Sequence, residues 1–205
     1  MTLTTGSTEH TAINEILASV GQAPVTTLDQ TNPDVAIAHT TLLQVSREVQ
    51  AEGWTFNQEF HVEYTPDTNN EIIVPNDILH IDASEVPANV DIDVVIRSGK
   101  LYDRHNHTFE FTNGPIECDV IRLYDYADLP KPIQAFITAR ASAIVSSRIV
   151  GDSTQYQILQ QNEAYTRALA MQYDTTQADL SFFGKPEGSA KSSYQSFQPF
   201  KALYR

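Results

Sequence analysis

Apolar residues recur every three or four positions between Asn32 and Gly53, a spacing that places them on one face of a helix. They are Val35, Ala38, Leu42, Val45 and Val49. The Asn32 side chain can accept a hydrogen bond from the first turn, and Pro33 has the φ angle and missing N–H that suit the first helical position. Gly53 favours a stop, because glycine enters the left-handed conformation without strain. The pattern predicts one helix that leads directly into a strand at residues 54–56.

Two apolar residues of this helix, Ile37 and Leu43, lie off the apolar stripe and on either side of it. A helix with apolar residues on more than one face packs against more than one neighbour. Ile37 and Leu43 are therefore candidate contacts between the subunits of an oligomer, and we expect at least one of them to be buried there.

One helix is predicted before this one, and two more follow near the C-terminal end. Residues 11–20 carry an apolar face that Gly21 closes. A third helix opens at residues 128–130 and runs to about residue 150, where Gly151 ends it. Asp152 then caps a fourth helix that continues to about residue 173.

Between the second and third helices the apolar period changes to two, which is typical of half-buried strands. Trp54, Phe56, Phe60, Val62 and Tyr64 alternate with polar residues and form the first strand. Turn residues separate the later strands, and Ser98-Gly99 marks the clearest hairpin. The predicted strands after the first are residues 72–74, 78–81, 90–97, 100–104, 108–112 and 118–124.

About six or seven short antiparallel strands between helices, with no alternation of strand and helix, predict an α+β fold. Because two helices precede the strands and two follow, we expect a four-helix bundle with an inserted antiparallel β domain and an extended tail. The predicted division is residues 8–53 with 128–175 for the helical bundle, 54–127 for the β domain and 176–205 for a docking tail.

Two arginines of the third helix fall on its apolar stripe, with Arg140 at the centre and Arg148 at the edge. A buried guanidinium needs a carboxylate or carbonyl groups as partners. Either the two side chains extend along the stripe to water, or they pair with acids of the N-terminal half, within the subunit or across to a neighbour.

The tail lacks periodicity but interleaves aromatic residues with cations. It can stack on single-stranded nucleic acid, remain an unstructured terminus, or place its aromatic side chains in pockets of another subunit. The last reading predicts Phe197, Phe200 and Tyr204 as anchors, with Lys201 and Arg205 meeting acidic partners.

The net charge of −13 is distributed unevenly over the 205 residues. Through residue 96 fifteen Asp and Glu face Arg47 alone, whereas from residue 97 eleven acids face twelve Lys and Arg. The negative electrostatic field of the first half repels nucleic acid, which argues against sequence-specific DNA binding by that half.

Few residues of the sequence suggest a catalytic or metal-binding site. Asp91 with Asp93, or His105 with His107, can share a strand face and suggest an acid/base pair or a metal site, but exposed polar residues explain both pairs. Cys118 is the only cysteine, which excludes an internal disulfide and indicates a buried structural thiol. The sequence has no phosphate-binding glycine-rich loop, no nucleophile elbow and no metalloprotease helix. We therefore expect no enzyme activity and no cofactor.

No apolar run approaches the roughly eighteen residues of a membrane helix, so no membrane partner is expected. The first eleven residues have neither the basic flank nor the apolar centre of a signal peptide. The chain is expected to work in a cytoplasm or in a particle assembled there.

The helix at residues 33–52 and several shorter motifs together resemble the tail tubular protein A family, the head-to-tail adaptor of short-tailed double-stranded DNA phages. The similarity spans roughly residues 12–175 and depends on the order and spacing of the motifs. The motifs are Ile13-Asn14-Glu15-Ile16-Leu17-Ala18-Ser19, Gly53-Trp54-Thr55-Phe56-Asn57, Gly99, Tyr102-Asp103-Arg104, Ile121-Arg122-Leu123, Asp125-Tyr126 and Gly151.

This resemblance implies a structural virion protein that forms a dodecameric ring between the portal protein and the tail nozzle, tail tubular protein B. Such a ring seals the filled head and extends the channel through which double-stranded DNA passes without sequence specificity. The family implies no cofactor, and assembly in the host cytoplasm. The alternative from another class is an acidic non-phage binding module, or a hydrolase that uses carboxylates of the β domain.

Overall fold

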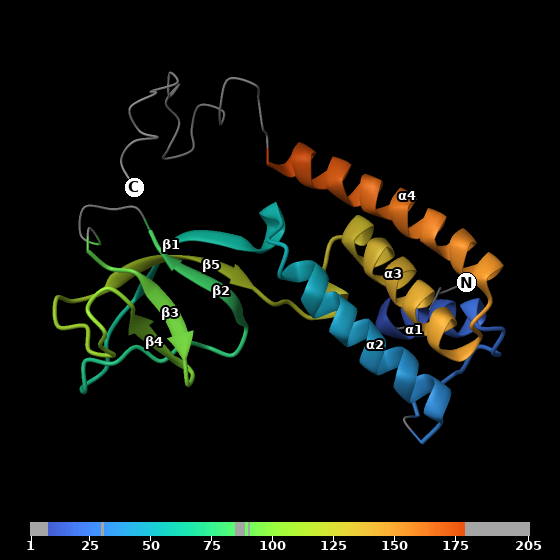
Figure 1. The fold of residues 1–205 in the computed structure, drawn as a ribbon, viewed down its shortest axis with the longest axis horizontal. Coiled ribbons are helices and arrows are strands. Elements are labelled where there is room, and N and C mark those ends of the chain that lie inside the picture. Colours follow the sequence, from blue (N-terminus) through green and yellow to red (C-terminus); the bar gives the residue numbers. More distant parts are fainter. Residues whose placement is uncertain (1–7, 30, 85–88, 90, 179–205) are drawn as a thin grey trace, which may run out of the picture.

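The computed structural model describes residues 8–29, 31–84, 89 and 91–178. Helices gather at one end of the molecule and strands at the other (Figure 1). The elements in chain order are α1 (Thr8–Ser19), α2 (Pro33–Gln50), the short 3-10 helix η1 (Thr55–Asn57), β1 (Gln58–Tyr64), β2 (Ile78–Ala83), β3 (Val94–Arg97), β4 (Lys100–Asp103), β5 (Ile116–Arg122), the 3-10 helix η3 (Tyr126–Asp128), α3 (Lys131–Ile149) and α4 (Ser153–Gln177).

The caps that the sequence predicts are present. The side chain of Asn32 accepts a hydrogen bond from the backbone N–H of Asp34 at 3.0 Å, and Asp152 accepts one from Thr154 at 2.8 Å. All five residues of the predicted α2 stripe are buried. Gly53 has a φ of +76°, although α2 itself ends three residues earlier, at Gln50.

The helix α3 is the centre of the helical lobe, which we define as α1, α2, α3 and α4. It contacts each of the other three helices, and eleven of its residues are buried around most of its circumference. Figure 1 shows α4 lying along α3 on the outside. The core joins Phe136 of α3 to residues of α1 and α2, and each such burial is worth roughly 1.5–3 kcal/mol.

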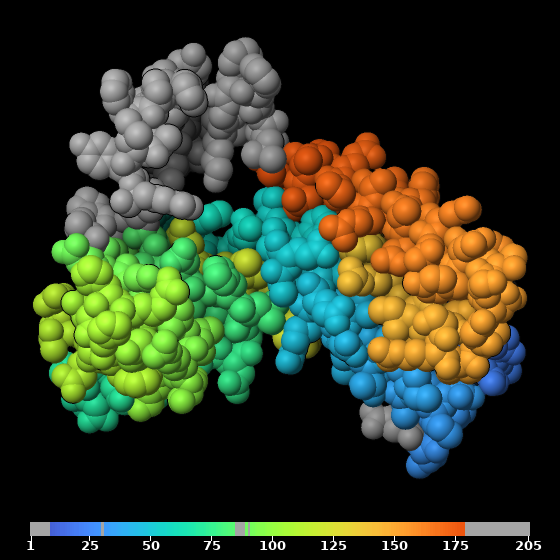
Figure 2. All heavy atoms as spheres, viewed as in Figure 1, coloured from blue at the N-terminus to red at the C-terminus, as the bar shows by residue number. Residues whose placement is uncertain are grey.

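The strand lobe, which we define as β1 to β5, contains two small antiparallel sheets. The first has the order β1-β5-β2, and the second is the hairpin β3-β4. Ser98 and Gly99 both have positive φ angles at the hairpin turn, as the sequence predicts. A second core cluster lies here, built around Ile72, Leu101 and Cys118, and Figure 2 shows the two lobes as two masses of atoms joined through the middle of the molecule.

The α+β class, with four helices flanking antiparallel strands, is therefore confirmed. The closed four-helix bundle and the domain boundaries stay predictions. Trp54 and Tyr126, at the two ends of the predicted β domain, are buried with the helices. Most of the predicted tail, residues 179–205, lies outside the described residues.

Four details of the predicted strands are wrong. Residues 55–57 form a 3-10 turn instead of a strand. Residues 72–74 and 108–112 contribute single bridges, at Ile73 and Thr108, so the described residues form five strands. The strand expected at 90–97 begins at Val94, which leaves Asp91 and Asp93 in the preceding loop. Phe60 is 52% exposed, because the alternation breaks beside it.

The break after Phe60 is a β-bulge. The register of β1 against β5 shifts between Glu59 and Val62, and His61 has a φ of +57°. The N–H of His61 donates to a carboxylate oxygen of Asp119 at 3.0 Å, so a side chain replaces the usual ladder partner. A bulge inserts one residue and turns the following side chains to the other face.

Candidate functional site

Two short segments carry the chain between the lobes: residues 51–57 lead from α2 to β1, and residues 123–125 lead from β5 to η3. We call their meeting point the junction. A protein that holds two lobes at a fixed angle must do so through the contacts at such a junction. Within the described part of the chain, the densest set of side chain to backbone hydrogen bonds between distant residues lies here.

Gln50, the last residue of α2, joins the two segments. Its fully buried side-chain amide donates to the carbonyl oxygen of Tyr124 at 3.0 Å and accepts from the backbone N–H of Tyr124 at 2.8 Å. One bond is donated and one is accepted, as between two paired residues of neighbouring antiparallel strands. A buried backbone group without a hydrogen-bond partner is costly. Tyr124 lies outside the strands, so the Gln50 amide provides the partners of its backbone N–H and carbonyl groups.

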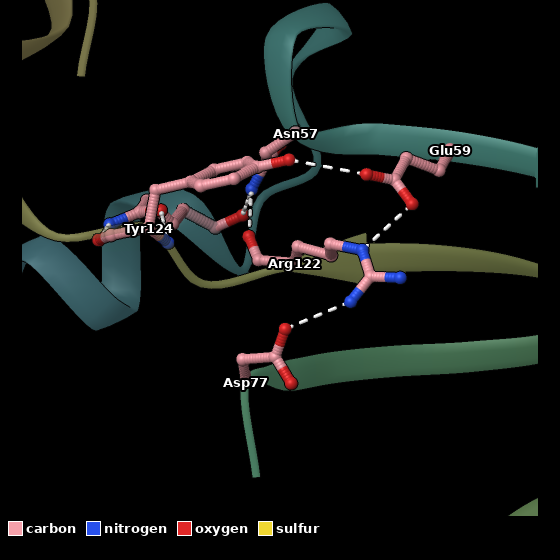
Figure 3. A network of polar contacts seen from close by, with 6 residues as sticks. Asn57, Glu59, Asp77, Arg122 and Tyr124 are labelled. Atoms are coloured by element: carbon pink, nitrogen blue, oxygen red, sulfur yellow. Dashed lines mark hydrogen bonds and ion pairs between the residues drawn. The ribbon is translucent and has the colours of Figure 1, made fainter. Parts of the chain in front are cut away.

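Asn57 makes a second link with three hydrogen bonds, one of which crosses to a distant part of the chain, at Arg122 (Figure 3). Its amide nitrogen donates to the carbonyl oxygens of Gln50 and Arg122, both at 2.9 Å. Its amide oxygen accepts from the backbone N–H of Trp54 at 2.9 Å, which closes the turn at residues 55–57. The side chain is fully buried, so all its bonds are shielded from water.

Trp54 anchors the junction to the helices. Its ring nitrogen donates to the carbonyl oxygen of Val49 at 2.7 Å, and its ring packs against Phe136 of α3 with centroids 6.4 Å apart. Helix α4 reaches the same segment, because the backbone N–H of Thr55 donates to Asp174 at 2.7 Å. Three helices therefore hold the segment that leads into β1.

Arg122 organises the strand side of the junction. Its guanidinium donates to Glu59 of β1 at 2.7 Å and to Asp77, just before β2, at 2.9 Å (Figure 3). The hydroxyl of Tyr124 donates to the same Glu59 at 3.2 Å. The bond to Glu59, with help from Asp77, raises the pKa of Arg122 against the opposing effect of burial. The three strands of the first sheet are thus joined at their ends nearest the helices.

Acids at the end of α2 pair with cations of the C-terminal helices. Arg140 of α3 lies 3.5 Å from Glu48 and 3.9 Å from Glu52. It therefore pairs with acids of its own subunit and does not extend to water alone. Arg167 of α4 pairs with Glu52 at 2.9 Å and lies over the ring of Phe136. Part of the acidity of the first half is therefore balanced inside the protein.

The other residues predicted as contacts lie on the surface or outside the described residues. Ile37 is 39% exposed and Leu43 is 47% exposed, on either side of the buried stripe of α2. The guanidinium of Arg148 lies 3.4 Å from the hydroxyl of Thr41. It pairs with no carboxylate among the residues that the structure describes. The tail residues outside the description are Phe197, Phe200, Lys201, Tyr204 and Arg205.

The carboxylates and histidines of the strand lobe serve the local structure. Asp91 and Asp93 precede β3, so the prediction that they share a strand face is wrong, and Asp93 pairs with Arg104 at 2.6 Å. His105 and His107 lie in a tight turn. Burial opposes ionisation of Asp103, but hydrogen bonds from Asn106 and His105 outweigh it and lower the pKa of Asp103. No group of three or more metal-ligating side chains occurs in the part of the chain described.

Cys118 is fully buried in the strand lobe. Burial raises the pKa of its thiol to about 12, and the nearby Asp119 and Asp82 add to the effect. We expect a maleimide at pH 8 to leave the folded protein almost unlabelled, because about one thiol in ten thousand is ionised there. Labelling in urea, followed by mass spectrometry, should go to completion. Rapid labelling of the folded protein would contradict the buried position.

The sequence reasoning missed Gln50 and Asn57 as structural residues. Gln50 lies at the end of an amphipathic helix, where an amide is ordinarily exposed. Asn57 gives a weak signal, because it ends the run of residues 53–57 and can cap a turn.

Comparison with known proteins gives two matches. Residues 10–180 match the family described as tail tubular protein. Tail tubular protein A of Klebsiella phage KP34 is 26% identical over 159 residues, which cover 77% of this chain and 82% of that protein. The family match covers both lobes and the junction, and it agrees with the resemblance seen in the sequence. In the described residues no helix is long and apolar enough to cross a membrane.

Proposed function

The chain belongs to the tail tubular protein family, and on this premise we propose that it is a ring-forming adaptor between the head and tail of a short-tailed phage. A structural role in a phage tail follows from the family itself. The proposed ring is dodecameric, joins the portal protein to the tail nozzle, tail tubular protein B, and surrounds part of the DNA channel. It is assembled in the host cytoplasm and stays in the virion. Such a protein acts through shape and charge and needs no cofactor.

The family match over residues 10–180 carries this proposal, and the junction supports it. An adaptor transmits force and position from one partner to another, so its lobes must keep a fixed relation. The buried side chains of Gln50 and Asn57 support that relation through their hydrogen bonds to Tyr124 and Arg122, because bonds made by buried groups are costly to break.

We propose that Ile37 and Leu43 lie between subunits of the ring. Both are exposed on a helix whose core face is already filled. We assign Arg148 to the same contact, because its guanidinium has no carboxylate partner within the described chain and a neighbour's acidic half can provide one. Arg140 is occupied by Glu48 and Glu52, so its contribution is to hold α2 and α3 together beneath the contact.

We propose that acids of the first half, outside the ion pairs of the junction, line the channel. An acidic wall repels phosphate, which keeps the duplex centred and mobile. Reversal of lumen-facing acids to Lys is expected to slow DNA ejection at low salt. Ejection should recover at high salt, where the reach of the field is shorter. Timed ejection from particles at two salt concentrations checks this, and a rate that is slow at both would argue against an electrostatic wall.

We propose that the tail docks on the portal or on a neighbouring subunit, with Phe197, Phe200 and Tyr204 as anchors. Lys201 and Arg205 then meet acidic partners. Truncation after Asp179 should leave the melting temperature of the subunit nearly unchanged and weaken its attachment to filled heads. Burying one aromatic ring is worth roughly 2 kcal/mol before ordering costs, so three rings make a measurable difference. Calorimetry with a head-binding assay checks this, and normal attachment would make the tail a passive terminus.

The mass of the assembled protein tests the proposed function. Sedimentation of the purified chain should give either a species near twelve times 22.9 kDa on its own, or a monomer that joins a larger complex when its portal protein is added. A fixed monomer in both conditions would contradict the ring and favour the alternative of a monomeric binding module.

A further inference from the structure

The helix α4 presents an outer face without charge. Its three charged residues are Glu163, Arg167 and Asp174, spaced by four and seven positions, which places them on one side of a helix. That side faces the body of the protein, because Arg167 pairs with Glu52 and Asp174 accepts from the N–H of Thr55. The remaining circumference of this helix carries only apolar, small and uncharged polar residues.

Three large apolar side chains lie along this outer face. Ile158, Tyr165 and Leu169 are spaced by seven and four residues, so they form one stripe, and they are 62%, 64% and 41% exposed. Ala170 is the only residue of α4 that is buried in the structure as described. In Figures 1 and 2 α4 is the outermost helix beyond α3, and no other described element lies on its outer side.

A surface helix that faces only water carries charged residues opposite its buried side. In α4 the arrangement is reversed, since the charges point inward and the apolar stripe points outward. Charge depletion with exposed aromatic and aliphatic residues is the composition of the centre of a protein interface. The outer face of α4 therefore has the properties of a contact surface.

We propose that a second copy of this chain packs on the outer face of α4, an inference that rests on the proposed ring. Each copy carries a net charge of −13, so two copies repel one another over most of their surfaces. They can approach at the lowest electrostatic cost through a face without charge. The chain's own tail has four cations and is better matched to an acidic surface.

The outer face of α4 is large enough to form part of a contact between two subunits of the ring. At 1.5 Å per residue α4 is about 37 Å long, and a strip about 10 Å wide along it covers roughly half of the area that each partner contributes to a standard interface. Ring contacts join two different surfaces of neighbouring subunits. The exposed Ile37 and Leu43 of α2 are the apolar surface that a neighbouring copy can offer.

Photocrosslinking from two matched positions of α4 tests the proposal. Asn162 lies within the stripe, and Gln160 lies on the opposite flank, so Asn162→Cys and Gln160→Cys each replace one exposed amide. A benzophenone maleimide labels the new thiol alone, because Cys118 is buried. Each labelled full-length chain is mixed with its portal protein and irradiated, and crosslinked peptides are identified by mass spectrometry.

The expected result is an adduct of twice 22.9 kDa from Asn162→Cys, with little or none from Gln160→Cys. A crosslink to residues 179–205 of the same chain, a crosslink to the portal protein, or no adduct where microscopy shows rings would each overturn the proposal. Absence of rings with the unmodified chain would instead contradict the proposed function, so the two failures are distinguishable.

A second pair of variants gives an independent readout. Tyr165→Asp with Leu169→Asp places two charges in the stripe, whereas Gln160→Asp with Met171→Asp places two charges on the opposite flank. We expect loss of rings from the first pair alone, with both pairs retaining the helical circular dichroism of the parent. Rings that survive the stripe charges would overturn the proposal, as would equal loss from both pairs.

Discussion

Replacement of Asn57 by Ala is expected to lower the free energy of unfolding by about 3 kcal/mol or more. The substitution removes the partner of three backbone groups: the N–H of Trp54 and the carbonyls of Gln50 and Arg122. Each such group left buried without a partner costs roughly 1–3 kcal/mol. The side chain is fully buried, so water cannot easily replace it.

Urea denaturation followed by circular dichroism measures this effect. Asn69→Ala is the matched control, because Asn69 lies in an exposed turn of the strand lobe. Asn57→Asp keeps the acceptor for Trp54 and removes both donors, so it should also be strongly destabilising. If Asn57→Ala changed stability no more than Asn69→Ala does, the junction would not hold the lobes together in the way described here.

Replacement of Ile37 and Leu43 together by Gln is expected to abolish ring formation and leave the fold intact. Both side chains are substantially exposed in the single chain, so their loss removes little from its core. In an assembled ring the same two side chains would be withdrawn from water, each worth roughly 1.5–3 kcal/mol. Because every subunit repeats the contact, the effect on a closed ring is large.

Negative-stain microscopy for rings, with far-UV circular dichroism for the fold, separates assembly from folding. Thr68→Gln changes an exposed turn position of the strand lobe, away from α2, and should leave rings unaffected. Unfolding of the double variant would place both residues in the core of the subunit. Normal rings would exclude both from the contact.

The helices follow from local signals in the sequence. An apolar period of three to four residues defines α2, and a capping side chain defines the start of both α2 and α4 without reference to the rest of the chain; both caps form as predicted. The hairpin at Ser98-Gly99 is equally local, since two residues with positive φ determine its turn. Within the described residues these elements needed no knowledge of distant partners.

The strands that were predicted incorrectly depend on distant residues. Asn57 closes its turn with a local bond to Trp54, but its amide is also bound to Arg122, 65 residues away, and together these bonds override the β propensity of residues 54–56. The bulge at His61 depends on the carboxylate of Asp119, 58 residues away. Neither partner can be read from a local pattern, so alternation alone gave an uninterrupted strand.

The same limit applies to the candidate site. The exposed positions of Ile37 and Leu43 follow from the helical period, and a partner for Arg140 among the acids of the first half was one of the expected alternatives. The pairing of Gln50 with Tyr124 spans 74 residues and was not predicted. The outer face of α4 became visible only once the partners of Arg167 and Asp174 were known.

Electron microscopy of the protein mixed with its portal protein is the decisive test of the proposed ring. We expect a closed twelve-fold ring on the portal, with an axial channel and with the strand lobe held at one fixed position relative to the helical lobe in every subunit. Portal particles that bind no ring, or that bind single subunits with lobes at variable angles, would contradict the proposed ring-forming adaptor.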